Sequence, residues 1–102
     1  MTSIFRDRDG HLRASVHEFP PILADFLETD VAENRERCEY LLAGLGQGRD
    51  GQPFEAYGNI YELVAGPDGA VIRNAYDDTV APLRLSLDEL ETALTAWRQA
   101  ME

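Results

Sequence analysis

The chain has little of what marks a secreted or membrane-bound protein. It contains a single cysteine, Cys38, and only two histidines in 102 residues. One cysteine cannot form an internal disulfide, which fits a reducing compartment. No apolar run approaches the roughly 20 residues that span a bilayer, and the opening segment MTSIFRDRDG lacks the apolar core of a signal peptide. We therefore expect a soluble, cytoplasmic protein.

Positive charge is also scarce. Nineteen Asp and Glu residues stand against nine basic residues, all of them Arg, so the formal net charge is −10 at pH 7. A surface with this balance repels the phosphate backbone of nucleic acids and anionic lipid headgroups. Nucleic acid and membrane are therefore not expected partners, whereas a basic protein partner fits the charge.

Length and composition predict one folded domain over residues 1–102. Apolar residues make up 44% of the chain and charged residues 27%, which is typical of globular proteins. A domain of this size buries only about two thirds of the surface of its unfolded chain. Because this leaves little room for an internal cavity, we expect any functional site to lie on the surface.

The N-terminal part predicts a hairpin followed by a short helix. Residues 11–16, HLRASV, alternate apolar and polar side chains as in a strand with one buried face. RDRDG at 6–10 supplies the turn, and we expect this hairpin to begin one edge of the sheet. The prolines at 20–21 end the extended segment, and ILADFLE at 22–28 favours a short helix.

A second helix is predicted to begin at Asp30, with Glu33 completing a capping box. The segment GLGQGRDGQP at 44–53 is expected to end this helix and form a mobile loop. The thiol of Cys38 should be inert packing. The apolar residues of the helix fall within one arc of about 100° and should lie on the sheet: Val31, Cys38, Leu41, Leu42 and Leu45.

The second half predicts a hairpin over 58–74, a short strand over 83–86 and a last helix capped by Ser86 with Glu89. The fold class is therefore α+β, with an antiparallel sheet of four to five strands, including two hairpins, covered by two to three helices. The last helix should dock along an apolar stripe within an arc of about 120°: Leu87, Leu90, Ala93, Leu94, Trp97 and Met101.

Reactive chemistry finds little support in the sequence. His11 and His17, with Asp9 nearby, are conceivable metal ligands, but metal centres usually need three or four converging ligands. The adjacent Asp77 and Asp78 lie in a polar connection, where turn formation is a simpler interpretation than acid–base catalysis. The glycine-rich segment follows a helix and lacks the lysine of a phosphate-binding loop. We expect no catalytic residue, no metal and no cofactor.

The acidic segment 25–39 gives the strongest functional prediction. An exposed tyrosine among carboxylates suits a binding hot spot, because the ring buries much area at low entropic cost while the charges steer a basic partner. A solvated helix face with one exposed aromatic residue is the alternative. The predicted partner-binding residues are Asp30, Glu33, Glu36, Glu39 and Tyr40.

Four stretches of the chain resemble the small bacterial YacL family. They are FRDRDG near the start, ILADFLETDVAEN after it, GNIYEL in the middle and LSLDELETALTAWRQAM at the end. The resemblance covers nearly the whole chain but rests on spaced single residues. Phe54 stands where a Trp is expected ahead of the Gly-x-x-Tyr strand, and Phe26 is alone in the first short helix. Because members of this family are largely uncharacterised, the resemblance implies a fold and no active site.

Two classes of function follow from these patterns. The favoured one is a non-enzymatic, acidic interaction protein that binds a basic partner, such as an immunity-type inhibitor of a basic nuclease toxin. The alternative is a small ligand- or metal-binding domain or enzyme that uses His11 and His17. Self-association through an uncovered sheet edge is a third hypothesis, so both a monomer and a homodimer are compatible with the sequence.

Overall fold

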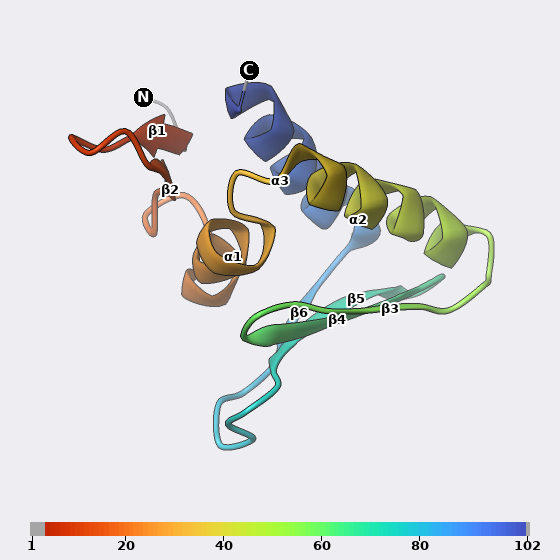
Figure 1. The fold of residues 1–102 in the computed structure, drawn as a ribbon. Coiled ribbons are helices and arrows are strands. Elements are labelled where there is room, and N and C mark those ends of the chain that lie inside the picture. Colours follow the sequence, from red (N-terminus) through yellow and green to blue (C-terminus); the bar gives the residue numbers. More distant parts are fainter. Residues whose placement is uncertain (1–3, 102) are drawn as a thin grey trace.

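The computed structural model describes residues 4–101 and has the predicted α+β class (Figure 1). None of the helices in this range is long and apolar enough to cross a membrane. The elements in chain order are β1 (Ile4–Arg6), β2 (Leu12–Ala14), α1 (Pro21–Phe26), the π-helical turn η1 (Leu27–Val31), α2 (Arg35–Arg49), β3 (Phe54–Tyr57), β4 (Tyr61–Gly66), β5 (Gly69–Asn74), β6 (Leu83–Leu85) and α3 (Leu87–Ala100).

The four C-terminal strands form one antiparallel sheet in the order β3-β4-β5-β6. All three α-helices lie on one side of this sheet, and its other face is open (Figure 1). Alternate residues along the strands point into the helical layer, as the period of two requires. The buried residues of this inner face are Phe54, Ala56, Tyr61, Leu63, Ala65, Ala70 and Ile72.

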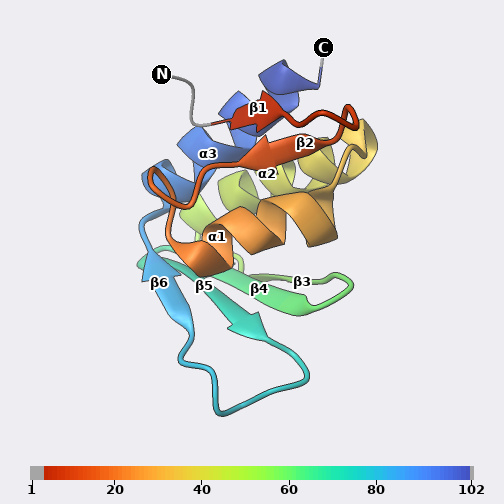
Figure 2. The same ribbon diagram turned by 90° about the vertical axis from the view of Figure 1, so that its left-hand side faces the viewer.

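The N-terminal hairpin forms a separate two-stranded sheet. It does not begin an edge of the main sheet as expected, but lies on the far side of the helices, so that the molecule has three layers (Figure 2). Leu12 and Ala14 are buried against the helical layer. The backbone N–H of Ala14 donates to the Glu28 carboxylate at 2.9 Å, which attaches β2 to η1. The strand β2 pairs with β1 and not with a strand of the main sheet.

The second long helix begins five residues later than predicted, at Arg35. Asn34 caps it, because its side-chain oxygen accepts the N–H of Arg37 at 3.0 Å. Between the helices the chain breaks at Ala32, which has a φ of 52°. The indole N–H of Trp97 donates to the carbonyl of Ala32 at 2.7 Å and holds this break against α3.

Residues 44–49 of the glycine-rich segment are helical and not part of a loop, since α2 continues to Arg49; the helix ends within the segment as predicted, and only residues 50–53 connect it to β3. A Cβ atom on Gly44 would lie 2.2 Å from the ring of Phe54, and one on Gly48 would lie 3.2 Å from the backbone of Ala65. Both glycines therefore let α2 approach β3 and β4 closely. Their spacing of four residues places them on the buried side of the helix.

The last helix agrees with its prediction. Ser86 and Glu89 form the expected capping box. Cys38 is fully buried, as expected for inert packing, and its thiol donates to the carbonyl of Leu94 at 3.3 Å. Burial raises the pKa of this thiol. Of the predicted stripe on α3, Met101 is half-buried and the others are buried: Leu87, Leu90, Ala93, Leu94 and Trp97.

Candidate partner-binding surface

Asp30, the first of the predicted partner-binding residues, is a structural residue and not part of an exposed surface. Its side chain is only 7% exposed. One carboxylate oxygen accepts the N–H of Ile60 at 3.0 Å and the other accepts the N–H of Tyr61 at 2.8 Å. The carboxylate thus satisfies backbone donors at the start of β4, which explains why it does not cap a helix.

Glu33 is exposed, but an arginine of the same chain pairs with it. The guanidinium of Arg6 donates to its carboxylate at 2.8 Å and lowers the pKa of Glu33. This ion pair ties the N-terminal hairpin to the segment before α2. Because the pair cancels most of the field of the carboxylate, Glu33 contributes little to the attraction of a distant partner.

The remaining predicted residues, Glu36, Glu39 and Tyr40, lie together on the exposed side of α2. No ion pair to another residue of 4–101 involves either glutamate. The Tyr40 side chain is 52% exposed. Its ring packs against Phe54 with centroids 5.4 Å apart, and the guanidinium of Arg37 lies 5.7 Å from its centroid. These contacts hold the ring in place while one side stays accessible.

Tyr57 lies next to this surface, at the end of the edge strand β3, where its side chain points to the open face of the sheet. Its side chain is 66% exposed at the end of β3. The guanidinium of Arg37, which lies against the Tyr40 ring, donates to the Tyr57 carbonyl at 2.9 Å. The Glu62 carboxylate, opposite Tyr57 on β4, raises the pKa of the phenol. Arg37 therefore connects the Tyr40 ring to the backbone of β3, and the two tyrosine side chains lie on either side of this strand.

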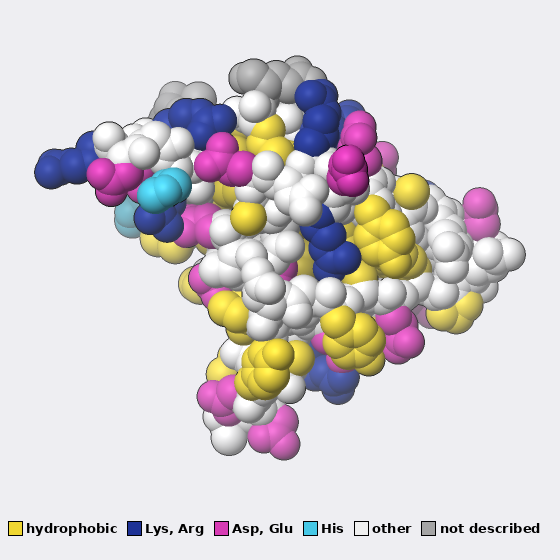
Figure 3. Space-filling model, viewed as in Figure 1, with side chains coloured by type: hydrophobic (Ala, Val, Ile, Leu, Met, Phe, Trp, Pro, Cys, Tyr) yellow, Lys and Arg dark blue, Asp and Glu magenta, His cyan; other side chains and the backbone are white. Residues whose placement is uncertain are grey.

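We call this region the Tyr40 surface. The space-filling view shows hydrophobic side chains over α2 and the adjoining sheet, with arginine and acidic side chains beside them (Figure 3). Sequence reasoning missed its sheet half because β3 was not predicted. The Tyr40 surface consists of Glu36, Arg37, Glu39, Tyr40 and Tyr57.

Two side chains of α2 donate hydrogen bonds to carbonyls at the two ends of β3, one of the two edge strands of the main sheet. Gln47 donates to the carbonyl of Pro53 at 3.2 Å, just before β3, and Arg37 donates to the carbonyl of Tyr57 at its end. Carbonyls that already accept a hydrogen bond are poor partners for an added strand. The β3 edge is therefore partly protected against pairing with a second copy of the chain.

The two histidines belong to different turns. Ligand atoms of Asp7, Asp9 and His11 lie within 4.8 Å of one another in the β1–β2 turn, and this group does not include His17. The Asp7 carboxylate already accepts the Nε–H of Arg13 at 2.8 Å. It also accepts the backbone N–H groups of Asp9 and His11. These bonds hold the turn together and lower the pKa of Asp7.

Other candidate reactive groups have structural partners. Asp77 accepts both the backbone N–H and the hydroxyl of Thr79, which confirms the interpretation of this segment as a turn and lowers the pKa of Asp77. Within residues 4–101, every buried polar side-chain atom has a hydrogen-bond partner.

Comparison of the chain with protein-family models, curated proteins and solved structures found no match. The geometry of the site therefore carries the functional interpretation.

Proposed function

We propose that this protein is a non-enzymatic interaction protein that binds a basic protein through the Tyr40 surface. The observation that supports this most is the pair of exposed carboxylates, Glu36 and Glu39, which join no ion pair within residues 4–101 and lie near two exposed tyrosines. Tyrosine and arginine are enriched among residues that dominate binding energy. The Tyr40 surface combines both with a net negative charge, because its two carboxylates outnumber the one guanidinium.

The net negative charge of the chain indicates which class of partner it would bind. A chain with a formal charge of −10 attracts a basic surface over distances at which contacts have not yet formed, and such steering raises association rates by about 10- to 1,000-fold at low salt. A nuclease toxin, whose nucleic-acid-binding surface is basic, suits this attraction. The protein would then act as an immunity-type inhibitor in the cytoplasm.

Photo-crosslinking in the native host tests this function. A benzoylphenylalanine placed at position 40 or 57 should capture the same basic protein, whereas the same group at the exposed Val16 should not. Glu36→Arg with Glu39→Arg should abolish the capture at both positions. Capture of an acidic protein, or capture that survives this double substitution, would contradict the proposal.

The resemblance to the YacL family supports an inference about ancestry, which rests on the four stretches named above. It adds nothing to the choice of partner, because it carries no active site. Its test is a wider set of related sequences, in which the spaced residues of FRDRDG and GNIYEL should recur together.

A second candidate function is divalent-metal binding by Asp7, Asp9 and His11, which lie close enough to share an ion. Zn²⁺ should then raise the melting temperature by mass action, and His11→Ala should remove this shift while His17→Ala leaves it unchanged. A shift that is the same in both variants, or no shift at all, would exclude this site. The ion pair between Asp7 and Arg13 competes with such an ion.

A further inference from the structure

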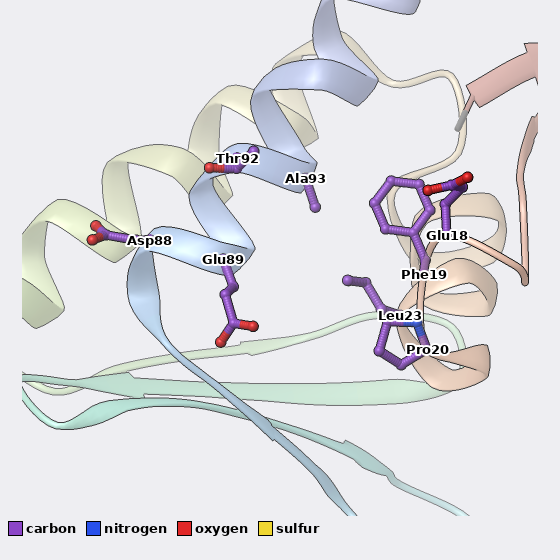
Figure 4. A pocket seen from close by; sticks show the side chains of 8 residues that line it. All are labelled: Glu18, Phe19, Pro20, Leu23, Asp88, Glu89, Thr92 and Ala93. Carbon is purple, nitrogen blue, oxygen red and sulfur yellow. The ribbon is translucent and has the colours of Figure 1, made fainter. Parts of the chain in front are cut away.

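A groove of about 380 Å³ runs between the start of α1 and the first turns of α3 (Figure 4). Phe19 and Leu23 face Ala93 across it. Leu23 and Ala93 are buried, Phe19 is half-buried and Pro20 is exposed. The floor of the groove is therefore apolar, and none of its residues belongs to the Tyr40 surface.

Carboxylates lie on both sides of this apolar floor. Glu18 stands on the α1 side, and no ion pair to another residue of 4–101 involves it. Glu89 stands on the α3 side, where its carboxylate accepts the backbone N–H of Ser86 at 2.8 Å in the capping box, which lowers its pKa. Asp88 also lines the groove but points toward α2 (Figure 4), where Arg49 donates to it at 2.6 Å.

The electrostatic field at the groove is negative. The N-terminus of a helix carries about half a positive charge, which the carboxylates of Glu18 and Glu89 together exceed. A carboxylate on each side of an apolar floor stabilises a cation that reaches the groove through an apolar stem. Long basic side chains have this character, because their methylene groups pack on apolar surface while the charged end stays at its border.

The size of the groove limits its occupant. Its volume lies at the lower end of the roughly 300–1,000 Å³ of small-ligand sites, which suits one or two side chains and excludes a docked helix. Arginine fits better than lysine, because its planar guanidinium is weakly hydrated and stacks on aromatic rings such as that of Phe19. We propose that the groove binds an arginine side chain in a short basic segment of the partner protein.

This inference rests on the proposed function only in taking the partner to be basic. The residues that line the groove are not those of the Tyr40 surface. The probe is a peptide of sequence GLRLRG with blocked ends, titrated into the ¹⁵N-labelled protein. Amide shifts should change at 19–23 and 89–93. A peptide with citrulline in place of arginine has nearly the same shape without the charge, and should bind at least about tenfold more weakly, or 1.4 kcal/mol.

Two substitutions that change the net charge equally locate the binding. Glu18→Arg should weaken the peptide at least about tenfold, while Asp78→Arg, at an exposed position outside both the groove and the Tyr40 surface, should leave its affinity unchanged. Thr92→Arg, at an exposed position of the groove, should block it sterically and by charge. If a variant fails to fold, the amide shifts of the wild-type protein still show where the peptide binds.

The outcomes separate the groove from the Tyr40 surface. Peptide shifts confined to 36–40 and 57, with loss of binding in Glu36→Arg, would overturn the groove and leave the proposed function standing. Peptide binding in the groove together with no crosslink at position 40 would overturn the proposed function of the Tyr40 surface and leave the groove standing. Equal binding of the arginine and citrulline peptides, or no shift at 19–23 and 89–93, would also overturn the groove.

Discussion

The acidic residues before α2 and those on its exposed side differ in what they contact. Asp25 accepts the phenol O–H of Tyr61 at 2.6 Å, and Asp30 accepts two backbone N–H groups of β4. On the next turns of the chain, Glu36 and Glu39 are exposed and join no ion pair within residues 4–101. The first group connects layers of the fold, whereas the second faces solvent.

This difference shows that a run of acids in a sequence does not make a uniform surface. Asp30 and Glu33 face other parts of the chain because η1 turns them toward β4 and toward the N-terminal hairpin. The formal charge of −10 is the same in any fold. The number of carboxylates that remain able to contact a partner depends on which of them already bond to other residues of the chain. The comparison can be tested at single residues, since the two groups predict opposite effects on stability and on binding.

The largest effect is expected from Asp30→Ala. The substitution leaves the backbone N–H groups of Ile60 and Tyr61 without their acceptor, and loss of a buried charged acceptor with its donors left unsatisfied costs about 3 kcal/mol. Urea unfolding should show this loss, with the matched Glu36→Ala changed by less than about 0.5 kcal/mol. Equal stability of the two variants would remove the distinction between the two groups.

A second test uses two glycines of α2 that face opposite sides. Gly44→Ala places a Cβ against the Phe54 ring, and such overpacking costs about 2 kcal/mol. Gly46→Ala meets nothing within 4 Å, so the better helix propensity of alanine should stabilise the protein by up to about 1 kcal/mol. Urea unfolding of both variants checks the opposite signs, and a gain from Gly44→Ala would contradict the close contact between α2 and β3.

A third test compares Glu36→Gln with Asp78→Asn, which change the net charge equally. Asp78 lies in the connection between β5 and β6, outside the Tyr40 surface. At about 0.1 M salt a charge acts over only about 10 Å, so the first substitution should slow association with the basic partner severalfold and the second much less. Stopped-flow association with the protein captured at position 40 gives both rates. If both substitutions slow association equally, net charge and not the Tyr40 surface determines the attraction.

Much of the fold could be predicted from local patterns in the sequence. The capping box of Ser86 and Glu89 and the apolar stripe of α3 depend on neighbours within one or two helical turns, and both are confirmed. The strand β3 has the same kind of signal, because Phe54 and Ala56 alternate with polar or exposed residues. Its four residues lie between the glycine-rich segment at 44–53 and the hairpin predicted over 58–74, and the prediction assigned them to neither.

The errors at the candidate site come from contacts across long sequence separations. Asp30 fits a capping box locally, yet backbone donors thirty residues away determine its position. Glu33 is an exposed helix residue by periodicity, but the folded hairpin brings Arg6 to it. Tyr57 joins the surface only because Arg37 reaches the end of β3. Such pairings depend on the arrangement of layers, which no local pattern contains.

The smallest effect is expected in the pH dependence of stability. Hydrogen bonds from Arg13 and the backbone lower the pKa of Asp7, and Arg6 lowers that of Glu33. A carboxylate with a lowered pKa stabilises the folded chain fully above its unfolded pKa, and this contribution disappears as the pH falls through the folded value. The loss should therefore begin near the ordinary values of 3.8 and 4.5 and continue below them.

Substitution of both acids should accordingly flatten the acid side of the stability profile. Asp7→Asn with Glu33→Gln removes two groups that take up protons at lower pH in the folded chain, so its melting temperature should fall less than that of the wild type between about pH 5 and pH 2. Glu36→Gln with Glu39→Gln changes the net charge equally but breaks no ion pair, so the wild-type slope should persist. Circular dichroism melts across this range compare the three profiles. Equal flattening in both double variants would mean that the acid sensitivity follows the total charge and not the ion pairs, because of these four acids only Asp7 and Glu33 form ion pairs within residues 4–101.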